Sequence, residues 1–218
     1  VAGFIGSSIA DRLLSEGHEV IGIDCFIDYY PKAMKEKNLV FAKSFKNFHF
    51  IEGNLLDLDL AKILTGAELI FHQAAQAGVR SSWGKDFAIY TDNNILASQV
   101  LLETTRLPQV KESLKKVVYA SSSSVYGDAE SLPTKETSVP CPLSPYGVSK
   151  LAAEHLMVLY TKEFGTPTAS LRYFTVYGPR QRPDMGFHRF LRATLSGEEI
   201  TIFGNGEGYG INASKAND

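Results

Sequence analysis

The sequence predicts an α/β fold in which helices cover both faces of a parallel sheet. Short β-rich apolar runs alternate with helical patterns along most of the 218 residues. This alternation is typical of βαβ units, whose strands pair in parallel. A serine run also follows one buried run directly, at the edge of the sheet where α/β proteins bind ligands.

The expected strands are short apolar runs that end at polar or turn residues. They span residues 19–24, 48–51, 68–72, 116–120, 169–174 and 200–203. Helical periodicity predicts helices over residues 6–16, 57–64, 87–106 and 146–164, and the charged, aromatic stretch 31–46 is also expected to be helical. Apolar residues near position 190 are interpreted as helix core rather than as ligands: Phe187, His188, Phe190 and Leu191.

Composition excludes several classes of protein. With 44% hydrophobic and 21% charged residues, the chain suits one globular domain. A net charge of -2 without a basic block argues against nucleic-acid binding. No run reaches the roughly 18 apolar residues of a membrane span. Cys25 and Cys141 are far apart, and neither they nor the histidines show metal-ligand spacing, so we expect no metal and a reducing compartment, the cytoplasm.

The chain opens with two glycines, Gly3 and Gly6, ahead of an amphipathic segment. Glycines there allow a tight turn and let a pyrophosphate approach the start of the helix. The strand that follows ends in Asp24, where a carboxylate accepts hydrogen bonds from ribose hydroxyls and repels a 2'-phosphate. NAD is therefore favoured over NADP. The competing interpretation of the two glycines is a simple packing turn between helix and strand.

Tyr146 and Lys150 lie four positions apart, so on a helix both side chains leave from one face. A neighbouring ammonium lowers a tyrosine pKa from about 10, and such a tyrosine can act as a general base and acid. The spacing alone also arises by chance on solvated helix faces. Two features of the context favour chemistry: Ser144-Pro145 is a helix start, and the serines at 121–124 follow a buried strand.

Together these residues resemble the extended short-chain dehydrogenase/reductases, specifically the NAD-dependent sugar-nucleotide epimerases and dehydratases. The resemblance covers about 200 residues in family order and implies a Rossmann-like sheet. The matching segments are residues 2–7, 22–24, 72–75, 92–94, 121–127, 144–150 and 171–174.

The resemblance implies a role for each matching residue. Tyr146 is the acid/base, Lys150 tunes its pKa and binds the nicotinamide ribose, and Ser122 is the catalytic hydroxyl, with Ser123 and Ser124 as rivals. The cofactor-binding residues implied are Gly3, Phe4, Ile5, Gly6, Asp24, Asn54, Leu55, Gln73, Ala74, Ala75, Ala77, Asn93, Tyr146, Lys150 and Phe174.

Within that family, the chain resembles epimerases more than dehydratases. Dehydratases carry an acid just after the catalytic hydroxyl, whereas this chain has Ser123 and Ser124. Segments 77–80 and 178–185 look like the branch that handles UDP-glucuronate. Arg182 could pair with the uronate carboxylate, although Arg180 and Arg182 could equally bind the nucleotide diphosphate or face solvent. The implied substrate-binding residues are Arg80, Ser123, Ser124, Thr175 and Arg182.

Both ends depart from the family pattern. The usual first strand and first glycine do not precede Gly3, and residues 208–218 do not match the family. We expect an incomplete NAD-binding domain over 1–207, with part of the substrate-binding region from 175, and a disordered tail over 208–218. Relatives imply a homodimer through helices beginning near Asn93 and Tyr146. Three alternatives remain open: UDP-glucose 4-epimerase, a non-catalytic NAD-binding fragment and the less favoured NADP-dependent reductase.

Overall fold

A computed structural model describes residues 1–128 and 132–200, which form five parallel strands in two sheets. Strands β1 (Val20–Asp24) and β2 (Phe48–Glu52) make one sheet, and β3 (Leu69–His72), β4 (Lys116–Ser122) and β5 (Thr168–Tyr173) make the other in that spatial order. The Rossmann-like parallel architecture predicted from the sequence is confirmed. The strand expected at 200–203 lies, apart from its first residue, outside the described residues, as does the tail at 208–218.

The two sheets are separated by a cavity of about 640 Å³ between β1 and β3. Ile21 of β1 and Leu69 of β3, both on the walls of this cavity, are exposed. The sequence predicted one continuous sheet without its usual first strand. The observed strands instead form two sheets, divided between β1 and β3.

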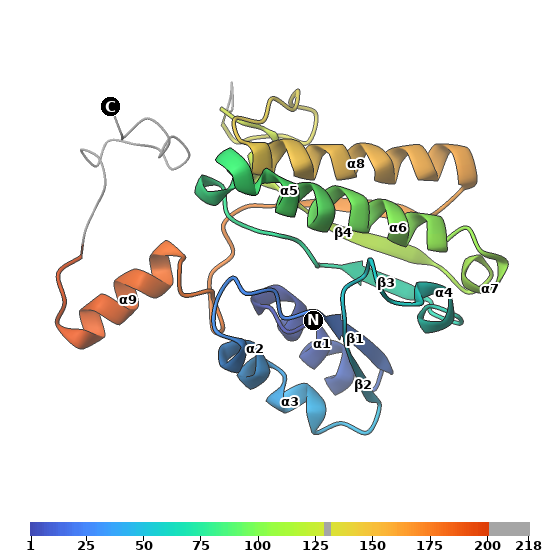
Figure 1. Cartoon of the computed structure of the whole chain (residues 1–218), viewed down its shortest axis with the longest axis horizontal. Coiled ribbons are helices and arrows are strands. Elements are labelled where there is room, and N and C mark those ends of the chain that lie inside the picture. Colours follow the sequence, from blue (N-terminus) through green and yellow to red (C-terminus); the bar gives the residue numbers. More distant parts are fainter. Residues whose placement is uncertain (129–131, 201–218) are drawn as a thin grey trace.

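Helices flank both sheets (Figure 1). Helices α1 (Phe4–Ser15) and α3 (Val40–Lys43) pack beside β1 and β2, and α6 (Ala97–Thr104) and α8 (Pro145–Phe164) pack together beside β4. The main hydrophobic core lies between these last elements and α4 (Leu60–Ile63). It includes Leu102, Val117, Ala153 and Met157, all fully buried.

Several helix predictions were correct in place but wrong in length. The stretch 31–46 forms two short helices, α2 (Lys32–Asn38) and α3, and only Leu60–Ile63 of 57–64 is helical. The stretch 87–106 contains α5 (Phe87–Tyr90), a π-helical segment η3 (Thr91–Leu96) and α6. Helix α7 (Pro108–Lys111) was not predicted.

Helix α9 (Gly186–Ser196) corrects another expectation. The interpretation of residues 187–191 as helix core is right about the helix and wrong about the core, because none of its residues is buried. Phe187 and Leu191 are both more than half exposed. Figure 1 shows α9 apart from both sheets, which is why its apolar side chains find no core to join.

Candidate active site

A second cavity, of about 450 Å³, lies at the carboxyl ends of the strands of both sheets. It is lined by the residues just after β1, β2, β3 and β5 and at the end of β4, where ligands bind in parallel α/β sheets. Nearly every site residue predicted from the sequence lines it: Gly3, Phe4, Ile5, Gly6, Asp24, Asn54, Leu55, Gln73, Ala74, Ala75, Ala77, Asn93, Ser122, Ser123, Ser124, Tyr146, Lys150, Phe174, Thr175 and Arg182.

Arg80 is the exception. It begins the short 3-10 helix η1 (Arg80–Ser82), is exposed, and does not line the cavity. Val79 is the last residue of that segment to line the cavity, so the substrate contact expected of Arg80 stays a prediction.

The predicted catalytic group comes together at the start of α8. Ser144 caps the helix by accepting a hydrogen bond from the Gly147 amide at 3.1 Å, which confirms the predicted helix start. A Cβ atom on Gly147 would lie 2.6 Å from the Ser124 carbonyl oxygen. Glycine at this position therefore allows the first turn of α8, with Tyr146, to approach the serine run after β4.

The pKa values in this group differ from the sequence prediction. Burial raises the pKa of Tyr146, while a hydrogen bond with Ser122 and the charge of Arg182 act in the opposite direction. Burial lowers the pKa of Lys150 to about 7, and its ammonium donates to the Ala120 carbonyl at 2.9 Å. The predicted lowering of the Tyr146 pKa by Lys150 is therefore wrong for the folded chain: burial raises that pKa, and the groups that act against burial are Ser122 and Arg182.

Asn94 is a buried site neighbour that the sequence analysis missed in favour of Asn93. Its side chain accepts from the Gln76 amide at 2.7 Å and donates to the Gln76 carbonyl at 3.1 Å. It also donates to Ser149 at 2.8 Å. Asn94 thereby ties the loop after β3 to the turn of α8 that carries Lys150. Its position inside a π-helical segment is a signal of function that only the structure provides.

The glycine loop and Asp24 meet at the opposite end of the cavity. Asp24 accepts hydrogen bonds from the Ala2 amide at 2.8 Å and the Phe26 amide at 2.9 Å. Helix α1 begins directly after Gly3, which makes no side-chain cap, and the first turn holds no acidic residue. The amides of that turn are thus available to an anion.

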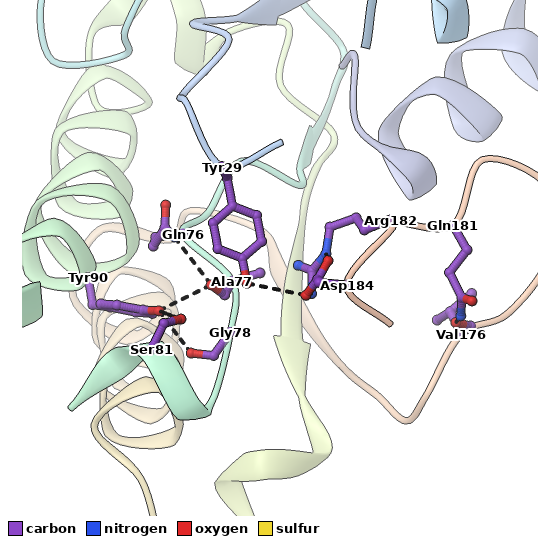
Figure 2. A network of polar contacts seen from close by, with 10 residues as sticks. All are labelled: Tyr29, Gln76, Ala77, Gly78, Ser81, Tyr90, Val176, Gln181, Arg182 and Asp184. Atoms are coloured by element: carbon purple, nitrogen blue, oxygen red, sulfur yellow. Dashed lines mark hydrogen bonds and ion pairs between the residues drawn. The ribbon is translucent and has the colours of Figure 1, made fainter. Parts of the chain in front are cut away.

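The segment after β5 brings Arg182 to the cavity wall. Arg182 makes two hydrogen bonds to Asp184, both at 3.1 Å, and its guanidinium lies 5.1 Å from the centre of the Tyr29 ring (Figure 2). Arg180 instead forms an ion pair of 2.6 Å with Asp11 of α1, so of the two arginines only Arg182 lines the cavity.

Comparison with known proteins agrees with this geometry. Residues 1–209 match the NAD dependent epimerase/dehydratase family. The chain belongs to this family. It is 50% identical over 207 residues to YtcB, an uncharacterized UDP-glucose epimerase of Bacillus subtilis, covering 94% of this chain and 64% of that protein.

Solved structures of family members superpose closely. A UDP-glucuronic acid 4-epimerase from Bacillus cereus, in complex with UDP-glucuronic acid and NAD, matches with a TM-score of 0.89 and 47% identity. A UDP-glucose 4-epimerase from Thermotoga maritima, with UDP-glucose, matches with a TM-score of 0.80 and 36% identity. Each match covers 94% of this chain and 64% of the other, so the chain spans about two thirds of these family members' length.

The cavity residues fit the dinucleotide of this family. The uncapped first turn of α1 offers amides to a pyrophosphate. The side-chain nitrogen of Gln73 is buried and lacks a hydrogen-bond partner within the described part of the chain, as expected of a donor meant for a ligand.

The described residues contain neither a candidate metal site nor a helix that could span a membrane. Across residues 1–128 and 132–200, no cluster of three His, Cys, Asp or Glu side chains is arranged to hold a metal ion. Every helix in those ranges is too short or too polar to cross a bilayer.

Proposed function

We propose that the protein carrying this chain is an NAD-dependent 4-epimerase of a UDP-sugar, with UDP-glucuronate as its substrate. The observation that carries the proposal is one cavity that joins three groups: the glycine loop with Asp24, the trio Ser122, Tyr146 and Lys150, and Arg182. The likeness to the Bacillus cereus UDP-glucuronic acid 4-epimerase supports the same assignment.

Tyr146 is proposed to take the proton from the sugar 4-hydroxyl and later return it. The Ser122 hydroxyl lies within hydrogen-bonding reach of the phenol, and Ser122 is proposed to hold the sugar oxygen, with Ser123 and Ser124 as its rivals. With a pKa of about 7, Lys150 can exchange its proton near neutral pH. When bound, NAD supplies the hydride chemistry, accepting and returning the hydrogen of the sugar carbon, so no net redox change occurs.

The cofactor is proposed to lie along the strand ends. Asp24 would accept from the adenosine ribose, while the first turn of α1 would bind the pyrophosphate through Gly3, Phe4, Ile5 and Gly6. The remaining proposed contacts are Asn54 and Leu55 at the adenine and Gln73, Ala74, Ala75, Ala77, Asn93, Lys150 and Phe174 toward the nicotinamide side.

Substrate choice is proposed to depend on the charge of Arg182. A guanidinium can bind a uronate carboxylate through two parallel hydrogen bonds. Ser123, Ser124 and Thr175 line the same cavity and add hydroxyl donors. No carboxyl side chain follows Ser122 in the serine run, so the acid that a dehydratase uses at that point is missing.

The first test replaces Tyr146 by Phe in the complete gene product. We expect interconversion of UDP-glucuronate and UDP-galacturonate to fall about 10³-fold, because general acid-base catalysis is lost. Tyr119→Phe is the matched control, since the Tyr119 hydroxyl is buried without a hydrogen-bond partner among the described residues. Turnover in Tyr146→Phe equal to that of the control would refute the assigned role.

A second candidate is UDP-glucose 4-epimerase, which the 50% identity to the Bacillus subtilis relative favours. Assays with both sugars separate the two. If UDP-glucuronate is the substrate, Arg182→Ala should impair that reaction and leave turnover of UDP-glucose unchanged. Equal impairment of both sugars would instead place Arg182 at the shared diphosphate.

We also propose a homodimer through the helices that begin near Asn93 and Tyr146, which are η3 continuing into α6, and α8. These helices pack side by side, and the outer side of α8 exposes Val148, Val158 and Leu159, each about half accessible. Light scattering of Leu159→Glu should then show a monomer.

A cytoplasmic location is proposed from the unpaired Cys25 and Cys141.

A further inference from the structure

Tyr29 was not singled out in the sequence, yet it bridges three segments around the cavity (Figure 2). It lies in the loop after β1 and lines the cavity. Its hydroxyl donates to Asp184 at 3.3 Å, and its ring packs 5.1 Å from the Arg182 guanidinium. One tyrosine therefore contacts both members of the Arg182–Asp184 pair.

Asp184 holds Arg182 from the solvent side. The Nε and Nη2 atoms of Arg182 donate to the two carboxylate oxygens of Asp184, each at 3.1 Å. The Arg182 side chain is 22% exposed and lines the cavity, whereas Asp184 is 45% exposed and does not line it. The carboxylate thus fixes the guanidinium without occupying the place of a ligand.

The other side of Tyr29 reaches the segment after β3. Its hydroxyl lies within hydrogen-bonding reach of Ser81, and Ser81 bonds the Tyr90 hydroxyl at 2.8 Å. Tyr90 in turn donates to the Gly78 carbonyl at 2.9 Å. A Cβ atom on Gly78 would lie 2.6 Å from the Tyr29 hydroxyl, so glycine there lets the two segments meet.

We propose that Tyr29 and Asp184 are positioning residues that fix the guanidinium of Arg182 for a sugar carboxylate and so determine selectivity for an acidic sugar. An arginine held by a bidentate carboxylate and an aromatic face loses less conformational freedom when it binds a second carboxylate. This inference rests on the proposed function. The opposite interpretation, that Asp184 competes with the substrate for Arg182, predicts effects of opposite sign.

The test uses Tyr29→Phe and Asp184→Asn in the complete gene product, with KM and kcat measured on UDP-glucuronate and UDP-glucose. Each substitution should raise KM for UDP-glucuronate about fivefold, the size expected for a partly exposed charge-assisted contact. The kcat, the KM for UDP-glucose and NAD affinity should stay unchanged. A purely structural role would instead alter both sugars together.

Tyr30→Phe is the matched control, because the Tyr30 hydroxyl is buried and makes no hydrogen bond within the described residues. In an Arg182→Ala background, Tyr29→Phe and Asp184→Asn should cause no further rise in the KM for UDP-glucuronate, since they act through Arg182. A wild-type protein that does not turn over UDP-glucuronate would defeat the proposed function. Wild-type turnover combined with an unchanged or lowered KM in Asp184→Asn would defeat this inference alone.

Discussion

The two sheets hold their polar residues in different ways. Around β3–β4–β5, buried charged groups find partners on distant elements: Lys150 donates to Ala120, and Glu154 of α8 pairs with Arg172 of β5 at 2.9 Å. At the end of β1, the Asp24 carboxylate instead accepts hydrogen bonds from two backbone amides, those of Ala2 and Phe26.

This difference between the two sheets indicates where a substitution that changes activity also changes folding stability. In the three-stranded region, Lys150 and the Glu154–Arg172 pair sit against the hydrophobic core, so changing them alters folding as well as activity. In the two-stranded region, Asp24 is part-buried and lines the cavity. We therefore expect substitutions there to change ligand binding, with a smaller effect on folding than substitutions in the three-stranded region.

The largest expected effect concerns Lys150. Its pKa is about 7 when folded and about 10.4 when unfolded. Between these values the unfolded chain binds a proton that the folded chain lacks, so stability rises with pH from about 7 to 10; below pH 7 the full cost of the buried charge applies. Lys150→Met should therefore be more stable than the wild type by about 4 kcal/mol at pH 6, and by almost nothing at pH 10.

Denaturant unfolding across that pH range measures the gap between variant and wild type. Lys116→Met, at an exposed position on β4, serves as the control and should show no such pH-dependent gap. A constant gap between Lys150→Met and the wild type would mean that Lys150 does not titrate in this range.

The next effect concerns the buried ion pair. Arg172→Met should lower the free energy of unfolding by about 3 kcal/mol, because it leaves the Glu154 carboxylate buried without its partner. Glu154 also accepts a hydrogen bond from Ser121, next to Ser122. Lys115→Met breaks the exposed pair between Lys115 and Glu68 and should leave stability close to that of the wild type. Equal losses in the two variants would show that burial of the pair is unimportant.

The smallest effect lies in the two-stranded region. Asp24→Asn should weaken NAD binding about tenfold, the cost of one charge-assisted hydrogen bond, and should reduce discrimination against NADP. Calorimetry with both dinucleotides measures the change, and Asp28→Asn, at an exposed position outside the cavity lining, is its control. A stability loss as large as that of Arg172→Met would remove the contrast between the two regions.

The local sequence by itself determined the positions of the strands, the start of α8 and the main site residues. Strand-helix alternation predicted all five strands of the described residues, and the Ser144-Pro145 pair predicted the start of α8, whereas α1 begins at Phe4, two residues before the predicted start. Motif order then placed Ser122, Tyr146 and Lys150 correctly in one cavity. These features are readable because they depend on neighbours within a few residues: side-chain periodicity, capping and spacing along one helix turn.

The tertiary structure decided what depends on distant contacts. It set the burial that lowers the pKa of Lys150 and raises that of Tyr146, the exposure of α9 and the placement of Arg80 outside the cavity. It also brought Tyr29 to Asp184 from 155 positions away. Burial and long-range pairing follow from how the elements pack together, and no local pattern in the sequence records that packing.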